Sequence, residues 1–191
     1  MKKLIALTIM FVLAFTLTAC GAVSGRITDT FVNIFSSGSY HMKAKMITDG
    51  VEATMESYVK RDIMAVIMET HGVTMRTVMR DNKVHIIDNA EKTVMTMPAS
   101  MGAPGSTPAV DTNKMNYLGS GTANFHGKNL PYDEYSVDNG GKTQLFVDGN
   151  KLAGIRNISG GNVADIVILV LDQNVPDSVF EIPAGYTQIS F

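Results

Sequence analysis

The chain has 191 residues and a formal net charge of −2, and this composition excludes several classes of protein. Its lysines and arginines form no cluster, so the sequence lacks the basic patch of a nucleic-acid-binding protein. Its one cysteine, Cys20, cannot form an internal disulfide. A chain of this length is expected to form one domain with a substantial core.

The first residues have the features of an export signal. Lys2 and Lys3 precede an uncharged apolar run of 16 residues, from Leu4 to Ala19. A membrane-spanning helix needs about 20 such residues. A positive start, a short apolar core and small residues at its end are instead typical of a secretory signal peptide. We therefore predict that residues 1–19 are a signal peptide.

The end of this run, Leu17-Thr18-Ala19-Cys20-Gly21, resembles the processing site of bacterial lipoproteins. In that class the cysteine receives acyl chains such as palmitate and becomes the new N-terminus. The resemblance implies that Cys20 is lipidated and that residues 20–30 form a tether. It also implies an extracytoplasmic protein anchored to the cell membrane, or to an outer membrane if the cell has one. The alternative is a plain signal peptide or anchor helix with an incidental cysteine.

A short helix is predicted where the folded domain, residues 31–191, begins. Thr28-Asp29-Thr30 offers good N-cap residues, and Phe31, Ile34 and Phe35 follow at the spacing of one apolar helical stripe. Ser36-Ser37-Gly38 ends the pattern. We expect this helix to pack on the sheet predicted next.

The stretch from Tyr40 to Met97 predicts six antiparallel strands, because turn residues recur about every ten positions and side chains alternate between them. In the first strand Met42, Ala44 and Met46 share one face, while His41, Lys43 and Lys45 share the other. The alternation predicts one dry and one wet face. The third strand, Ile63 to Met68, is apolar on both faces, so its outer side should be covered.

Residues 98–112 are predicted to be an irregular loop because they are rich in proline, glycine and serine. A loop of this length is either a lid or a disordered connector. Four further strands are expected at about 121–126, 132–138, 143–148 and 151–158. The apolar run Val163 to Leu171 favours a strand over a buried helix because it is rich in β-branched residues. The chain then ends in a one-turn helix and an extended tail.

The order of these elements, with the closing Pro-Asp-Ser-x-Phe-Glu-Ile-Pro-x-Gly-Tyr at residues 176–186, resembles the superfamily of the lipoprotein carriers LolA and LolB. The mycobacterial lipid-handling lipoproteins of the LppX and LprG type belong to the same group. The resemblance implies a mainly β (α+β) fold, an incomplete antiparallel β-barrel of about eleven strands wrapped around short helices. It also implies an apolar cavity for acyl chains. No cavity arginine of the carriers aligns here, so their mechanism is not carried over.

Catalytic patterns are missing from the sequence, which predicts a protein that is not an enzyme. No Gly-x-Ser-x-Gly elbow is present, and Gly119-Ser120-Gly121 is interpreted as a turn. Asp133 and Glu134 are adjacent, so on a strand they point to opposite faces. The four histidines, His41, His71, His85 and His126, are scattered and expected to be solvated.

Methionine is the one unusual feature of the dry face, and it leaves three functions open. The first is a compliant cavity for a lipid or lipoprotein acyl chain, because methionine repacks easily. The second is ordinary core filling in an interaction or sensor domain, with a protein partner that the sequence does not identify. The third is copper(I) binding by thioethers. Strand residues four apart lie about 13 Å apart, so only Met95 and Met97 could chelate one ion.

We favour the compliant cavity, which needs no cofactor. The predicted ligand-binding residues are Phe31, Phe35, Met42, Met46, Met55, Met64, Met68, Met75, Met79, Met95 and Met97.

Overall fold

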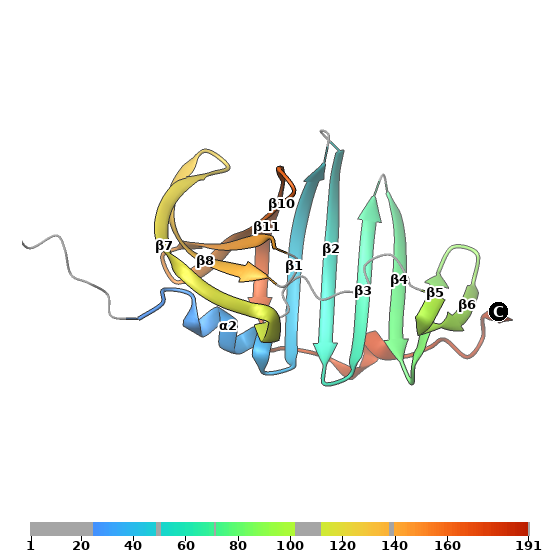
Figure 1. Cartoon of the computed structure of the whole chain (residues 1–191). Helices are drawn as coiled ribbons and strands as arrows, with labels where there is room; N and C mark the ends of the chain where they lie inside the picture. Colours follow the sequence, from blue (N-terminus) through green and yellow to red (C-terminus); the bar gives the residue numbers. More distant parts are fainter. Residues whose placement is uncertain (1–24, 49–50, 71, 102–111, 138–139, 191) are drawn as a thin grey trace, which may run out of the picture.

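The computed structural model describes residues 25–48, 51–70, 72–101, 112–137 and 140–190. These residues form one sheet of twelve strands in the order β12-β6-β5-β4-β3-β2-β1-β11-β10-β9-β8-β7 (Figure 1). The end strands β12 and β7 are not paired with each other, so the curled sheet stays open. The predicted incomplete barrel is therefore confirmed. Every described element lies after residue 24, so a chain that begins at Gly21 contains the whole described fold.

The described part of the chain has one α-helix and three short 3₁₀-helices besides the strands. The helices are α2 (Asp29–Ser36), η1 (Ala99–Met101), η2 (Thr112–Lys114) and η3 (Asp177–Phe180). The strands of the first half are β1 (Ser39–Thr48), β2 (Val51–Lys60), β3 (Ile63–Thr70), β4 (Val73–Arg80), β5 (Lys83–Asp88) and β6 (Thr93–Pro98). Those of the second half are β7 (Met115–Phe125), β8 (Lys128–Val137), β9 (Lys142–Asp148), β10 (Lys151–Ser159), β11 (Asn162–Asp172) and β12 (Thr187–Ser190).

The predicted six-stranded meander is β1–β6, and each strand pairs antiparallel with the next. Turn chemistry sets the register. Between β4 and β5, Asp81 and Asn82 both have positive φ, at 52° and 57°, as a two-residue hairpin turn of type I′ requires. The alternating side chains then separate a concave and a convex face.

The convex face of β3 is covered, as its apolar sequence predicted. Phe180 of η3 is buried against Ala65, Val78 and Ile87, and the segment after β11 runs along the lower ends of the strands in Figure 1. Arg76 holds that segment by donating from Nη2 to the carbonyl oxygen of Glu181 at 3.1 Å. The closing motif of the sequence is thus a cover for the convex face.

On the concave side, α2 packs its apolar stripe into the curl of the sheet. Phe35 is buried beside Tyr40, with their ring centroids 5.2 Å apart in an edge-to-face contact. Met42, Met55 and Met64 belong to the same buried cluster. The helix therefore fills part of the half-barrel.

The second half of the chain differs from the prediction in three places. Strand β7 begins at Met115, so Gly119-Ser120-Gly121 lies inside a strand, at a bulge, and not in a turn. His126 has a φ of 47° and lies in the turn between β7 and β8. The predicted extended tail adds a twelfth strand, because β12 pairs parallel with β6. The apolar run Val163 to Leu171 is strand β11, as predicted. Most of the predicted loop 98–112 lies outside the described residues, and only its ends, in η1 and η2, are seen.

Candidate ligand-binding site

The strand register places all nine predicted methionines on the concave face. Residues that pair directly across two strands share a face of the sheet. One cross-strand row contains Met64, Met79 and Met97, the next contains Met95, and the one after it contains Met55, Met68 and Met75. The methionine face is defined here as Met42, Met46, Met55, Met64, Met68, Met75, Met79, Met95 and Met97. The period-2 prediction of a single methionine-rich surface is confirmed.

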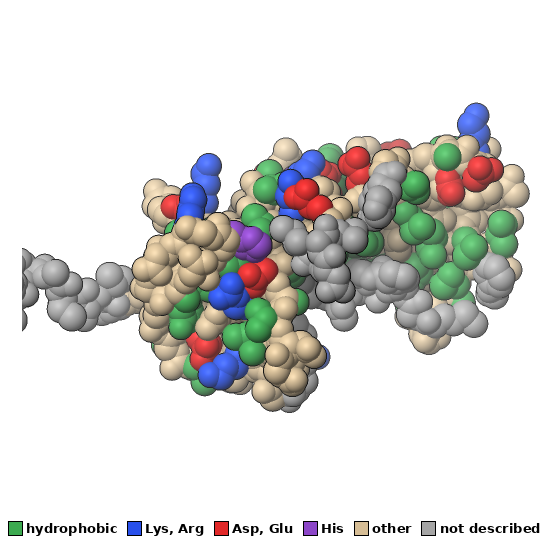
Figure 2. All heavy atoms as spheres, turned by 90° about the horizontal axis from the view of Figure 1, so that it is seen from above, with side chains coloured by type: hydrophobic (Ala, Val, Ile, Leu, Met, Phe, Trp, Pro, Cys, Tyr) green, Lys and Arg blue, Asp and Glu red, His purple; other side chains and the backbone are tan. Residues whose placement is uncertain are grey.

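Exposure varies among the methionines of this face. Met42 is fully buried and Met55 and Met64 are nearly so, whereas Met75 is 48% exposed. The remaining five are half-buried: Met46, Met68, Met79, Met95 and Met97. Figure 2 shows hydrophobic side chains gathered over the end of the molecule that β3–β6 form. The face therefore has a filled part that includes Met42, Met55 and Met64, and a partly exposed part that includes Met75, Met95 and Met97.

The two phenylalanines of the predicted site have different surroundings. Phe35 is a core residue, while Phe31 is half-buried and lines a cavity of about 480 Å³ next to β10 and β11. Met97 lines another cavity, of about 280 Å³, with Pro98 and Ser190. Each of these two cavities, which are lined wholly by described residues, is lined by one of the predicted ligand-binding residues. Sequence reasoning missed the first of them, because it lies between strands of the second half.

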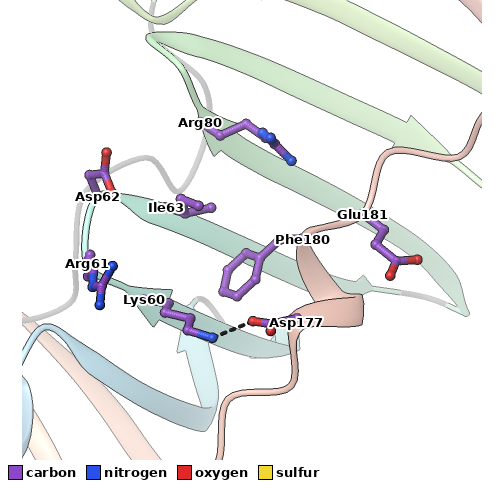
Figure 3. Close-up of a pocket in the computed structure, with 8 residues that line it drawn as sticks. All are labelled: Lys60, Arg61, Asp62, Ile63, Arg80, Asp177, Phe180 and Glu181. Atoms are coloured by element: carbon purple, nitrogen blue, oxygen red, sulfur yellow. Dashed lines mark hydrogen bonds and ion pairs between the residues drawn. The ribbon is translucent and has the colours of Figure 1, made fainter.

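A third cavity of about 300 Å³ lies on the convex side, beneath η3 (Figure 3). Phe180 forms its apolar wall, and Lys60 forms an ion pair with Asp177 across its edge. Arg80, which also lines it, is paired with Asp81 through Nε at 3.1 Å. Two of its cations are thus already neutralised by carboxylates of the same chain.

The wet face carries paired charges. Lys43 lies 2.5 Å from a carboxylate oxygen of Glu56, and this hydrogen bond lowers the pKa of Glu56. His41 and His85 are less solvated than predicted. His41 stacks on Tyr58 at a centroid distance of 4.5 Å, and burial lowers the pKa of His85, which bonds Thr96 at 2.9 Å. His71 lies outside the described residues.

A buried polar network, not foreseen from the sequence, fixes the start of α2. The carboxylate of Asp133 on β8 is fully buried. Its Oδ2 accepts hydrogen bonds from the backbone N–H of Thr28 at 3.0 Å and from the Thr28 hydroxyl at 2.8 Å, and its Oδ1 accepts one from Ser120. The predicted N-cap therefore acts differently, because Thr28 bonds a distant strand and makes no side-chain cap bond.

Tyrosine hydroxyls extend this network toward the tether. The Tyr135 hydroxyl lies 2.6 Å from Thr28 Oγ1, and that of Tyr117 lies 2.8 Å from Ser120 Oγ. Burial raises the pKa of Tyr135, so its hydroxyl stays protonated and available as a donor. The Arg26 guanidinium lies 4.9 Å from the centre of the Tyr117 ring. The network thus joins residues 26–28 to β7 and β8.

The described residues bring together few groups of catalytic type. Asp133 and Glu134 point to opposite faces, as predicted, and Glu134 accepts hydrogen bonds from Lys142 and Gln144 at 2.8 Å each. Among the described histidines, cysteines, aspartates and glutamates, no group of three could hold a metal ion. Among the described helices, none combines the length and apolar character needed to cross a membrane.

Comparison with known proteins identifies the fold alone. No protein-family model matches the sequence, and no curated protein matches it. The structure is similar to an uncharacterized conserved protein from Thermus thermophilus, with a TM-score of 0.52 and 11% identity over 85% of this chain and 100% of that chain. At this identity only the open-sheet fold is shared.

Two weaker similarities complete the comparison. One is to a chain of the MucA/MucB complex of Pseudomonas aeruginosa, with a TM-score of 0.45 and 11% identity over 83% of this chain and 60% of that chain. The other is to a DUF1329 family protein from Desulfovibrio piger, with a TM-score of 0.36 and 13% identity over 82% of this chain and 98% of that chain. These TM-scores are too low to carry an argument about function.

Proposed function

We propose that this chain is a lipid-anchored protein of the cell envelope that binds an apolar ligand, a lipid or acyl chain, without catalysing a reaction. The observation that carries the proposal is the partial exposure of the methionine face. Met75, Met95 and Met97 belong to none of the buried clusters formed by the described residues. Flexible thioether side chains on such a surface suit a ligand of variable shape.

The sequence supports the location and the kind of fold. Lys2, Lys3 and the apolar run before Cys20 favour export and lipidation. The resemblance to the LolA and LolB superfamily agrees with a curled, open sheet that holds a helix on its concave side. We infer that the ligand lies on this side, where α2 leaves part of the methionine face half-exposed.

A filled half-barrel that acts as an interaction or sensor domain is the second candidate. It is favoured by the complete burial of Met42 and the near-complete burial of Met55 and Met64 under α2. Mass spectrometry of lipids extracted from the purified chain that begins at Gly21 distinguishes the two. A stoichiometric lipid supports the binding function, and a lipid-free protein that also fails to take up added fatty acid contradicts it.

Replacing Cys20 by serine is expected to abolish acylation and processing, because the thiol is the atom that carries the thioether lipid. The variant should lose the acyl mass and retain residues 1–19. Detergent phase partitioning and intact-mass measurement check both results. A variant of mature size that still enters the detergent phase would refute the lipoprotein assignment.

Copper(I) is expected to bind only weakly to methionine pairs within one strand, because Met42 and Met46, like Met75 and Met79, are four residues apart and separated by about 13 Å. The register also places Met55, Met68 and Met75 side by side on β2, β3 and β4, where the Cβ atoms of directly opposite residues lie about 5 Å apart. These three are therefore tested beside Met95 and Met97. Competition with a tight copper(I) chelator measures this affinity. Stoichiometric capture of copper from the chelator would instead identify a metal site. The site lies on β6 if capture is lost on replacing Met95 and Met97 by leucine, and on β2–β4 if it is lost on replacing Met55, Met68 and Met75.

A further inference from the structure

Strands β10 and β11 separate halfway along their length. They pair from Ser159 and Asn162 as far as Gly154 and Val167, where the ladder ends. Beyond this point β10 continues beside β9, and β11 continues beside β1. The register shifts in both outer ladders at this place, which leaves Ala153 and Leu169 as the unmatched residues. Bulges bend strands, so this pair of bulges accounts for the opening.

The opening holds the cavity of about 480 Å³ that Phe31 lines from α2. Its apolar wall includes Leu152 and Ile168, which are buried, and Leu169, which is 47% exposed at the mouth. Four polar or charged residues complete the lining: Lys128, Asp148, Asn150 and Lys151. A volume in the range of about 300–1,000 Å³, apolar walls and a few polar groups are typical of a small-molecule site. We name this space the β10–β11 cavity.

The polar groups stand at the rim and leave one positive charge in excess. Lys128 Nζ lies 2.7 Å from Oδ2 of Asp148, so these two charges neutralise each other. Lys151 also lines the cavity, and no ion pair or hydrogen bond joins its ammonium group to another described side chain. An apolar cavity with an unpaired ammonium group at its mouth is complementary to a chain with an anionic end.

We propose that the β10–β11 cavity binds a single-chain fatty acid, with its hydrocarbon chain against Phe31, Leu152 and Ile168 and its carboxylate at Lys151. The site shares only Phe31 with the residues predicted from the sequence and contains no methionine. It therefore goes beyond the proposed function of the methionine face. Either site can be occupied without the other.

Photochemical labelling of the chain that begins at Gly21 tests the location. The probe is a 16-carbon fatty acid with a photoreactive group on its chain, and labelled peptides are mapped by mass spectrometry. Label in residues 150–153 or 168–171 is expected. Label confined to residues 42–97 overturns the cavity site and supports a ligand site on the methionine face. Label confined to the β10–β11 cavity supports the cavity site and overturns the ligand site on the methionine face. No label in either place overturns both.

Competition with unlabelled ligands tests the role of the charge. Palmitate should protect the cavity peptides at roughly five-fold lower concentration than hexadecanol, as expected for one partly exposed ion pair of about 1 kcal/mol. Lys151→Gln should remove this difference, while Lys83→Gln on β5, at the other end of the sheet, should keep it. Leu169→Glu places an anion at the exposed mouth of the cavity, so it should weaken the protection by palmitate more than the protection by hexadecanol. Equal protection by both ligands in the parent chain overturns the assignment of a carboxylate ligand.

Discussion

Replacing Asp133 by alanine is expected to lower the free energy of unfolding by about 2–6 kcal/mol, because two buried donors of Thr28 lose their acceptor and each costs about 1–3 kcal/mol. The carboxylate is fully buried and accepts hydrogen bonds from Thr28 and Ser120. Without it, the Thr28 hydroxyl, which is itself fully buried, and its backbone N–H lose their acceptor. Urea denaturation followed by circular dichroism measures the loss.

Glu134→Ala is the matched control, because Glu134 is the next residue of β8 and also accepts two side-chain hydrogen bonds. Its partners, Lys142 and Gln144, lie on the other face of the strand, and the Lys142 side chain is half exposed. The exposed pair with Lys142 contributes about 0–1 kcal/mol. Gln144 is buried and loses one acceptor, which costs about 1–3 kcal/mol, so the control should lose less than the Asp133→Ala chain. Limited proteolysis should also cut the Asp133→Ala chain more readily near residues 26–30. Equal losses in the two variants would show that the network does not hold α2.

The sequence predicted the elements whose signals are local. Period-2 alternation located β1–β6 and put the methionines on one face, because side-chain direction on a strand depends only on position. The same rule showed that β3 needed a cover on both sides. Phe180 supplies that cover together with Val179 and Ile182, three apolar residues that lie close together after Pro176 in the sequence.

The features that sequence reasoning missed depend on residues far apart in the chain. Thr28 and Asp133 are 105 positions apart, and nothing local to either residue indicates the other. The sequence predicts a strand that begins only at about residue 121, because Gly119 and Gly121 favour a turn, whereas β7 begins at Met115. Gly121 instead leaves room for the Tyr132 ring, to which a Cβ would lie only 2.7 Å away. The separation of β10 from β11 follows from two bulges, which alternation patterns do not reveal.

Single lysine substitutions on the methionine face are expected to separate binding from stability. Met68 and Met79 are half-buried, so a lysine there can keep its ammonium group near water while its stem lies along the sheet. Met68→Lys and Met79→Lys should cost about 1–2 kcal/mol of unfolding free energy. They should also abolish the part of fluorescent fatty acid uptake that belongs to the face, while the part that belongs to the β10–β11 cavity should remain. Denaturant unfolding measures the first effect, and the stoichiometry of a fluorescence titration measures the second.

Two controls bracket this result. Met42 is fully buried, so Met42→Lys places an unpaired charge in the core and should cost several kcal/mol, enough to unfold a domain of ordinary stability. Lys43→Met, one residue along on the wet face, removes a partly exposed ion pair with Glu56 and should change stability by no more than about 1 kcal/mol. If Met68→Lys and Met79→Lys unfold the chain as Met42→Lys does, the face is filled by its own side chains, and the interaction-domain function is favoured. If they stay folded and bind fatty acid as well as the parent chain, the ligand does not lie on the methionine face.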